Sequence, residues 1–96
     1  MSVTVELFYS STCPHCPEAK RTLTEVFDRI DAEIHFEEVN VLTPDGIKRA
    51  EEYGVMAVPT TIINTRHKIV GVSTKDRLLK VINGEVEKRQ TGSERP

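Results

Sequence analysis

The sequence contains very little cysteine: Cys13 and Cys16 are the only two in 96 residues, and they lie in one short segment. No disulfide can therefore connect distant parts of the chain, which is typical of proteins from a reducing compartment. The sequence also lacks an apolar run long enough to cross a membrane, and it lacks a basic stretch followed by an apolar run. We therefore expect no membrane segment, no signal peptide and a cytoplasmic location.

An excess of charge of one sign is also missing. Thirteen basic and 15 acidic residues are mixed along the chain and give a formal net charge of −2. This balance gives no reason to expect binding to nucleic acid or to an anionic membrane surface. With 38% apolar and 29% charged residues, 96 residues suit one globular domain with a modest core.

The hydrophobic periodicity predicts an α/β protein with the element order β-α-β-α-β-β-α. The expected elements are a strand over residues 3–9, a helix that ends near Ile30, a strand over 33–41, a helix from Thr43-Pro44 to Gly54, strands over 60–64 and 67–72, and a last helix from Ser73 to Gly84. The first βαβ unit should be parallel with a right-handed crossover, and the last two strands should form an antiparallel hairpin. Together they predict a four-stranded mixed sheet flanked by helices.

Several local signals set the boundaries of these elements. Ser73 to Asp76 resembles a capping box at the start of the last helix, and Gly84 is its expected stop. We therefore expect a domain over residues 1–84 and a polar tail over residues 85–96. In the second strand, Ile34 and Phe36 share one phase of the two-residue period while two valines share the other, so this strand either contains a bulge or is covered on both faces.

The segment Cys13-Pro14-His15-Cys16 carries the chemistry, because two thiols separated by two residues at a helix start can close and reopen a small disulfide. Cys13 should lie at or next to the N-cap with an exposed sulfur, where the helix terminus favours the thiolate. Cys16 should lie about one turn into the helix, where it can resolve a mixed disulfide formed at Cys13. Pro14 suits the first helical position, and His15 adds a titratable imidazole beside the thiolate.

The same cysteine pair could instead form half of a zinc or iron–sulfur site. Such sites usually need four ligands, and the chain has no second cysteine pair. A copper chaperone of the ferredoxin-like type remains an alternative of another class. That fold runs β-α-β-β-α-β, however, whereas a capped helix follows the second strand here. We therefore predict no metal site.

A second unusual feature is the apolar loop before the third strand, Val55-Met56-Ala57-Val58-Pro59. Connecting loops usually face water and are polar. At least one of its two valines should pack inward, and the remaining apolar surface could accept the backbone of a partner beside the thiol.

Three segments, YSSTCPHC, YGVMAVPT and IVGVSTKDRL, resemble the thioredoxin superfamily, and most closely the small archaeal thioredoxins that are also described as glutaredoxin-like. The resemblance covers about residues 3 to 83 and implies a thioredoxin-like fold. It implies that Cys13 is the nucleophile, that Cys16 is the resolving thiol and that Pro59 is a cis-proline facing them. It also implies that Val58 pairs with an extended substrate, with Met56 and Ala57 in contact, and that Gly71 permits close approach.

The resemblance implies a thiol–disulfide oxidoreductase that reduces disulfide-containing proteins, binds no cofactor and acts as a monomer. Its redox group is the Cys13–Cys16 disulfide, and its electron donor is expected to be a thioredoxin reductase, with glutathione in a glutaredoxin-like alternative. The sequence departs from typical thioredoxins in having Thr12 in place of a tryptophan. It also has Leu7, with Glu6 beside it, where they carry a buried aspartate that handles the proton of the resolving cysteine.

Overall fold

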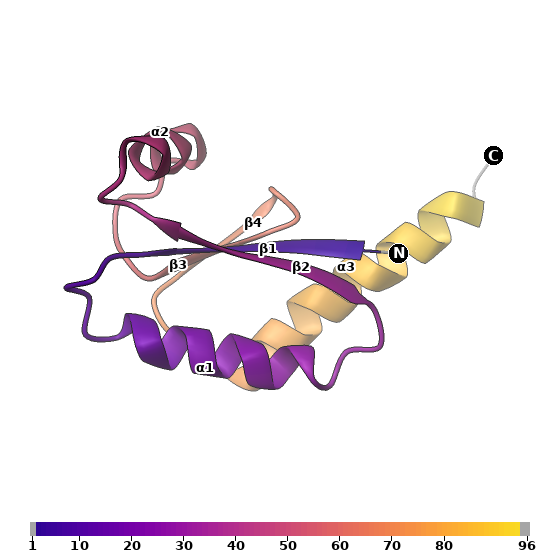
Figure 1. The fold of residues 1–96 in the computed structure, drawn as a ribbon. Coiled ribbons are helices and arrows are strands. Elements are labelled where there is room, and N and C mark those ends of the chain that lie inside the picture. The colour runs from indigo at the N-terminus through magenta and orange to yellow at the C-terminus, as the bar shows by residue number, and fades with distance from the viewer. Residues whose placement is uncertain (1, 95–96) are drawn as a thin grey trace.

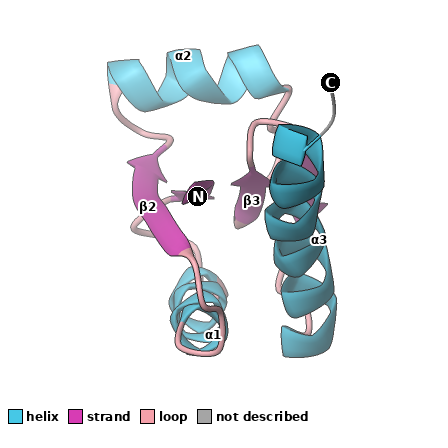
Figure 2. Cartoon of the chain, turned by 90° about the vertical axis from the view of Figure 1, so that its right-hand side faces the viewer, coloured by secondary structure: helices cyan, strands magenta, loops and turns pink. Residues whose placement is uncertain are grey.

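The protein forms a central sheet with helices on both faces (Figures 1 and 2). The structure, a computed structural model, describes residues 2–94, with side chains up to residue 86. The elements are β1 Ser2–Tyr9, α1 Cys16–Phe27, β2 Glu33–Asn40, α2 Pro44–Tyr53, β3 Thr60–Ile63, β4 His67–Val70 and α3 Lys75–Glu94. The predicted element order is confirmed. None of the helices in this described part is both long and apolar enough to cross a membrane.

The sheet has the strand order β2-β1-β3-β4. β1 pairs with β2 in parallel, whereas β1 with β3 and β3 with β4 are antiparallel, so the predicted mixed sheet and hairpin are confirmed. The parallel register is continuous from Ser2 opposite Glu33 to Tyr9 opposite Asn40. The second strand therefore has no bulge. Ile34 and Phe36 pack against one hydrophobic cluster and Val39 belongs to another, so both faces are covered and the apolar phase changes.

Two hydrophobic clusters lie on opposite sides of the sheet. The larger cluster joins Val3, Val5 and Leu7 of β1 to α1 and α3. The smaller cluster joins Phe8 of β1 to α2 through Ala50 and neighbouring residues. Figure 2 shows α2 on one side of the sheet and α1 with α3 on the other. Successive residues of β1 therefore point to different helices.

Both helix signals around α2 are confirmed. The Thr43 hydroxyl accepts a hydrogen bond from the Gly46 N–H at 3.0 Å, and Pro44 is the first helical residue. Gly54 ends the helix with a left-handed φ of 68°, a conformation that glycine adopts without the steric cost of a Cβ. The end of α2 thus leads directly into the apolar loop.

Two predictions about α3 are wrong. The N-cap is Thr74 and not Ser73, because the Thr74 hydroxyl accepts from the Arg77 N–H at 3.2 Å. The helix also continues through Gly84 to Glu94. One glycine inside a helix costs only about 1 kcal/mol, and the hydrogen bonds of the next residue, Glu85, with Asn64 and His67 offset that cost. The boundary between domain and tail stays a prediction.

The hairpin turn also lies one residue earlier than the sequence suggested. Its central residues are Asn64 and Thr65, both with positive φ, and the Arg66 N–H donates to the Ile63 carbonyl at 3.1 Å. Two positive φ values are the pattern of a type I′ turn, whose twist matches that of the paired strands. Asn64 also exchanges hydrogen bonds with the backbone of Thr4, which fixes the turn against β1.

Candidate active site

Cys13 and Cys16 form a disulfide between the end of β1 and the start of α1, with their Cα atoms 5.5 Å apart. Cys13 lies in the turn before the helix and is half-buried, and its N–H donates to the Ser10 carbonyl at 3.3 Å. Cys16 is the first residue of α1 and is only 5% exposed. Cys13 is therefore the more accessible of the two cysteines, but Cys16 opens the helix and does not lie one turn into it as predicted.

The N-terminus of α1 lies later in the chain than the sequence predicted. The N-cap is His15, and the proline of the first turn is Pro17 and not Pro14. Either proline suits a first turn, because the missing N–H has no partner there in any case. Local preference could therefore not decide between them. Pro14 and His15 are exposed beside the disulfide, and the His15 side chain makes no capping hydrogen bond.

The two cysteines line a cavity of about 270 Å³ together with Leu7 and with several side chains that the sequence did not single out. The cavity is also lined by Leu7, Tyr9, Ser10, Ser11, Pro17, Lys20 and Glu38. Lys20 Nζ and Glu38 Oε2 form an ion pair at 3.2 Å. The only sequence signal for Lys20 is its spacing of four residues from Cys16, which brings both to one helix face.

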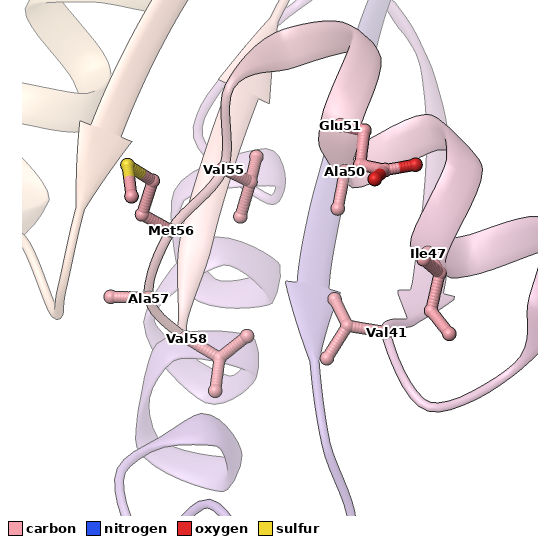
Figure 3. A pocket seen from close by; sticks show the side chains of 8 residues that line it. All are labelled: Val41, Ile47, Ala50, Glu51, Val55, Met56, Ala57 and Val58. Atoms are coloured by element: carbon pink, nitrogen blue, oxygen red, sulfur yellow. The ribbon is translucent and has the colours of Figure 1, made fainter.

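The apolar loop lines a second cavity, of about 310 Å³, against α2 (Figure 3). Val55 and Val58 point toward Val41 and Ala50, whereas Met56 and Ala57 point to the other side of the loop. Met56 is 95% exposed. The cavity brings three predicted substrate-binding residues together, Met56, Ala57 and Val58, with Val55 of the same loop. It adds residues that the sequence did not single out, namely Val41, Ile47, Ala50 and Glu51.

The remaining predicted site residues, Pro59 and Gly71, lie at the base of this loop and line neither of these two cavities. The Val58–Pro59 peptide bond is cis, and Pro59 is buried. The Gly71 N–H donates to the Pro59 carbonyl at 2.8 Å. Gly71 follows β4 and is not part of it, because β4 ends at Val70. Its φ of 81° lies in the left-handed region that favours glycine.

Glu6 and Leu7, the two residues at the place of the missing aspartate, face opposite sides of the sheet. Leu7 packs in the larger cluster and lines the cysteine cavity. Glu6 is 4% exposed, accepts from the Tyr53 hydroxyl at 2.9 Å and is bonded by the Arg49 guanidinium of α2. Glu6 therefore does not line the cavity that holds the cysteines.

Arg49 also donates to both oxygens of Glu37, at 2.7 and 3.0 Å. This hydrogen bonding lowers the pKa of Glu37 and raises that of Arg49. Burial and the hydrogen bond to Glu6 raise the pKa of Tyr53. The cluster of Glu6, Glu37, Arg49 and Tyr53 fastens α2 to β1 and β2, and with it the start of the apolar loop.

The element order excludes the ferredoxin-like copper chaperone, because a helix lies between β2 and β3. Among the described side chains, no group of three or more His, Cys, Asp or Glu residues could hold a metal ion.

Comparisons with known proteins find relatives over most of this chain. A family model described as "Thioredoxin domain" matches residues 1–83. A thioredoxin from Methanocaldococcus jannaschii is 42% identical over 83% of this chain and 92% of its own length. A probable thioredoxin from Methanothermobacter thermautotrophicus is 36% identical over 91% of this chain and its whole length. A thioredoxin-like protein from Clostridium perfringens has the same fold, with a TM-score of 0.76 at 23% identity over 85% of this chain and 69% of its own.

Proposed function

Because this chain belongs to the thioredoxin family and is a protein disulfide oxidoreductase, we propose that Cys13 attacks the disulfides of substrate proteins and that Cys16 resolves the product. The observation that carries this assignment is the difference in burial between the two sulfurs. Cys13 is half-buried in a turn, whereas Cys16 is 5% exposed in the first turn of α1. A partner's sulfur can reach Cys13 far more easily.

The reaction consists of two exchanges. The Cys13 thiolate attacks one sulfur of the substrate disulfide, so that a mixed disulfide forms and the other substrate sulfur leaves as a thiolate. Cys16 then attacks the Cys13 sulfur. This second step forms the Cys13–Cys16 disulfide and releases the second substrate thiolate. Two electrons have then passed from the protein to the substrate.

Replacing each cysteine separately tests the two roles. We expect Cys13→Ser to abolish disulfide reduction, because no nucleophile remains at the accessible position. We expect Cys16→Ser to accumulate a mixed disulfide between Cys13 and the substrate. Mass spectrometry after incubation with insulin, followed by acid quenching, measures both outcomes. Accumulation in Cys13→Ser in place of Cys16→Ser would reverse the roles.

For the substrate-binding surface we propose the apolar loop, with Val58 pairing to an extended substrate segment and Met56 and Ala57 in apolar contact with it. The exposure of Met56 and the cavity behind the loop support this proposal. Backbone pairing would accept many sequences, since it does not depend on one side chain. Pro59 would position this backbone, and Gly71 would leave room for the partner.

Gly71→Asp tests this surface. A Cβ at Gly71 meets no atom within 4 Å, so the new side chain is accommodated in space despite the positive φ. We expect turnover of insulin to fall by about tenfold or more, as loss of an interface contact of about 1.4 kcal/mol implies, while turnover of a small aromatic disulfide changes little. Equal losses on both substrates would contradict a docking role, and Gly71→Ala separates backbone strain from obstruction.

For the electron donor we propose a flavin-containing thioredoxin reductase, with the protein acting as a monomer in the cytoplasm, where thiols are kept reduced. Only one glycine, Gly71, stands where glutaredoxins carry a Gly-Gly pair, which disfavours glutathione. A coupled assay that compares thioredoxin reductase with glutathione tests this choice. Faster re-reduction by glutathione would favour the glutaredoxin alternative.

A further inference from the structure

Glu38 occupies a position where the pattern of β2 calls for an apolar side chain. Ile34 and Phe36 face α1 and pack against the larger cluster, and Glu38 is the next residue of that phase. It lies directly opposite Leu7 in the parallel register. A carboxylate beside an apolar cluster is unfavourable unless it is paired. Here Lys20 pairs with it, and the Glu38 side chain keeps 37% of its exposure.

The pair shares a cavity with both cysteines. Lys20 is one helical turn after Cys16 on α1, and Glu38 reaches the same cavity from β2. The titratable groups that line this cavity are Tyr9 from β1, Lys20 from α1, Glu38 from β2 and the two cysteines. Glu38 is thus the one carboxylate that lines it, since Glu6 is bound on the other face of the sheet.

The resolving step requires a proton acceptor. Only the thiolate attacks a disulfide, and the burial of Cys16 favours the neutral thiol over the thiolate. We propose that the Glu38 carboxylate accepts the Cys16 proton, directly or through one water in the shared cavity, and that Lys20 positions the carboxylate. The inference rests on the proposed function, in which Cys16 is the resolving thiol.

The Cys16 Sγ–H bond breaks, its proton goes to Glu38, and its electron pair forms the bond to Cys13 Sγ. The bond between Cys13 and the substrate sulfur breaks, and its electron pair leaves with the substrate as a thiolate. Glu38 then returns the proton to that thiolate or to solvent. No additional oxidant or reductant takes part.

Glu38→Gln tests this role, because it keeps the size of the side chain and removes the basic oxygen. With insulin in rapid acid-quench experiments, we expect the mixed disulfide to live about 100 times longer, the lower end of the effect of losing a general base. Formation of the mixed disulfide by Cys13 should stay within about twofold of the parent rate, since Glu38 plays no part in that step. The matched control is Glu33→Gln, which removes an exposed carboxylate at the other end of the same strand and should leave both steps unchanged.

Two further variants separate proton transfer from a structural effect. In Glu38→Ala at neutral pH, added acetate should shorten the lifetime of the mixed disulfide, whereas the same concentration of chloride should not. Lys20→Gln should slow resolution and Lys20→Arg should restore it, since arginine keeps the positive charge. Thermal unfolding of each variant checks that the fold is intact.

Three results would overturn the inference: an unchanged lifetime in Glu38→Gln, equal slowing of attack and resolution, or no effect of acetate on Glu38→Ala. Failure of the proposed function gives a different result, because Cys16→Ser would then not trap a mixed disulfide at all. Trapping in Cys16→Ser with normal resolution in Glu38→Gln would refute only the role of Glu38.

Discussion

His15 lies between the two cysteines in sequence and is the N-cap of α1. Its side chain makes no capping hydrogen bond and is exposed, so it is not tied to a structural role among the described residues. An imidazolium at this place adds to the positive end of the helix dipole near the Cys13 sulfur. Positive charge there stabilises the reduced protein, whose thiolate is negative, more than it stabilises the disulfide.

We therefore predict that His15→Ser has a more negative reduction potential than the parent. Because His15 is exposed and screened by salt, we expect a shift of about 30 mV or less, which corresponds to at most about 1.4 kcal/mol for a two-electron couple. Redox titration at low and at high ionic strength measures it. A shift in the positive direction, or one that grows with added salt, would contradict the electrostatic argument.

At the scale of elements, α2 matters because it ends where the apolar loop begins. Its attachment to the sheet depends on the nearly buried carboxylate of Glu6, which Arg49 and Tyr53 satisfy from two positions on the helix. A carboxylate in such a place is costly without its partners. The loop cavity is therefore supported by an ionic cluster on the side of the sheet opposite the cysteines.

We predict that Arg49→Met lowers the free energy of unfolding by about 3 kcal/mol, since Glu6 then keeps only the Tyr53 hydroxyl. Tyr53→Phe, which leaves the guanidinium in place, should cost about 1–2 kcal/mol. Urea denaturation measures both values. Adding Glu6→Leu to Arg49→Met should recover much of the loss, and the absence of any recovery would mean that Arg49 acts through packing.

The continuation of α3 past Gly84 gives a further prediction. A Cβ at Gly84 meets no atom within 4 Å, and no positive φ is recorded there. Gly84→Ala should therefore raise the free energy of unfolding by about 0.5–1 kcal/mol, because alanine loses less backbone freedom on folding. Urea denaturation checks this value. Destabilisation by alanine would indicate that the helix ends at the glycine, as the sequence alone suggested.

The errors at these boundaries have a common physical origin. Ser73 and Thr74 are adjacent residues with hydroxyl groups, and either could cap α3. Pro14 and Pro17 both lie near the start of α1, and either suits the first turn of a helix. Local sequence preference therefore could not place either helix start. The number and order of the elements were predictable because apolar periodicity extends over many residues. The end of α3 was not predictable, because the contacts of Glu85 come from the β3–β4 hairpin, about 20 residues away in sequence.

At the active site too, residues close together in sequence were predictable, and residues brought together only by the fold were not. Cys13 and Cys16 were recognisable because they are neighbours in the chain. Glu38 was not recognisable, because its approach to the cysteines depends on the register of β1 with β2 and on the packing of α1. The one sequence signal for Glu38 was its position, because it follows Ile34 and Phe36 on the same face of the strand. That position indicates a functional carboxylate only once both faces of the strand are known to be covered.

At the scale of the whole molecule, charged contacts hold α3 near its start and near its middle. Near its start, Lys75 pairs with Glu25 of α1 at 2.5 Å, and this contact lowers the pKa of Glu25. Further along, Glu85 accepts from Asn64 Nδ2 at 3.0 Å and lies 2.8 Å from His67 Nε2. These contacts join the last helix to the first helix and to the hairpin.

The Glu85 cluster predicts how stability depends on pH. The hydrogen bond from Asn64, together with those to His67 and the charge of Arg66, lowers the pKa of Glu85 against the opposing effect of its burial. In the unfolded chain the same carboxyl titrates near its ordinary value of about 4.3, so the unfolded state binds a proton first as the pH falls. The stabilisation is thus complete above that value and is lost progressively as the pH falls toward the lower, folded pKa.

We predict that the free energy of unfolding falls more steeply between about pH 5.5 and 3 in the parent than in Glu85→Gln, a range that confines the measurement to carboxyl titration. Near pH 7 the variant should be about 1–3 kcal/mol less stable, because a hydrogen-bonded buried carboxylate is lost. The difference should shrink toward pH 3, where the parent's carboxyl is also losing its charge. Urea denaturation across this range measures both slopes. The matched control is Glu18→Gln, which removes an exposed glutamate of α1 and should keep the slope of the parent. Parallel slopes for the parent and Glu85→Gln would show that the charge of Glu85 adds nothing to the attachment of α3.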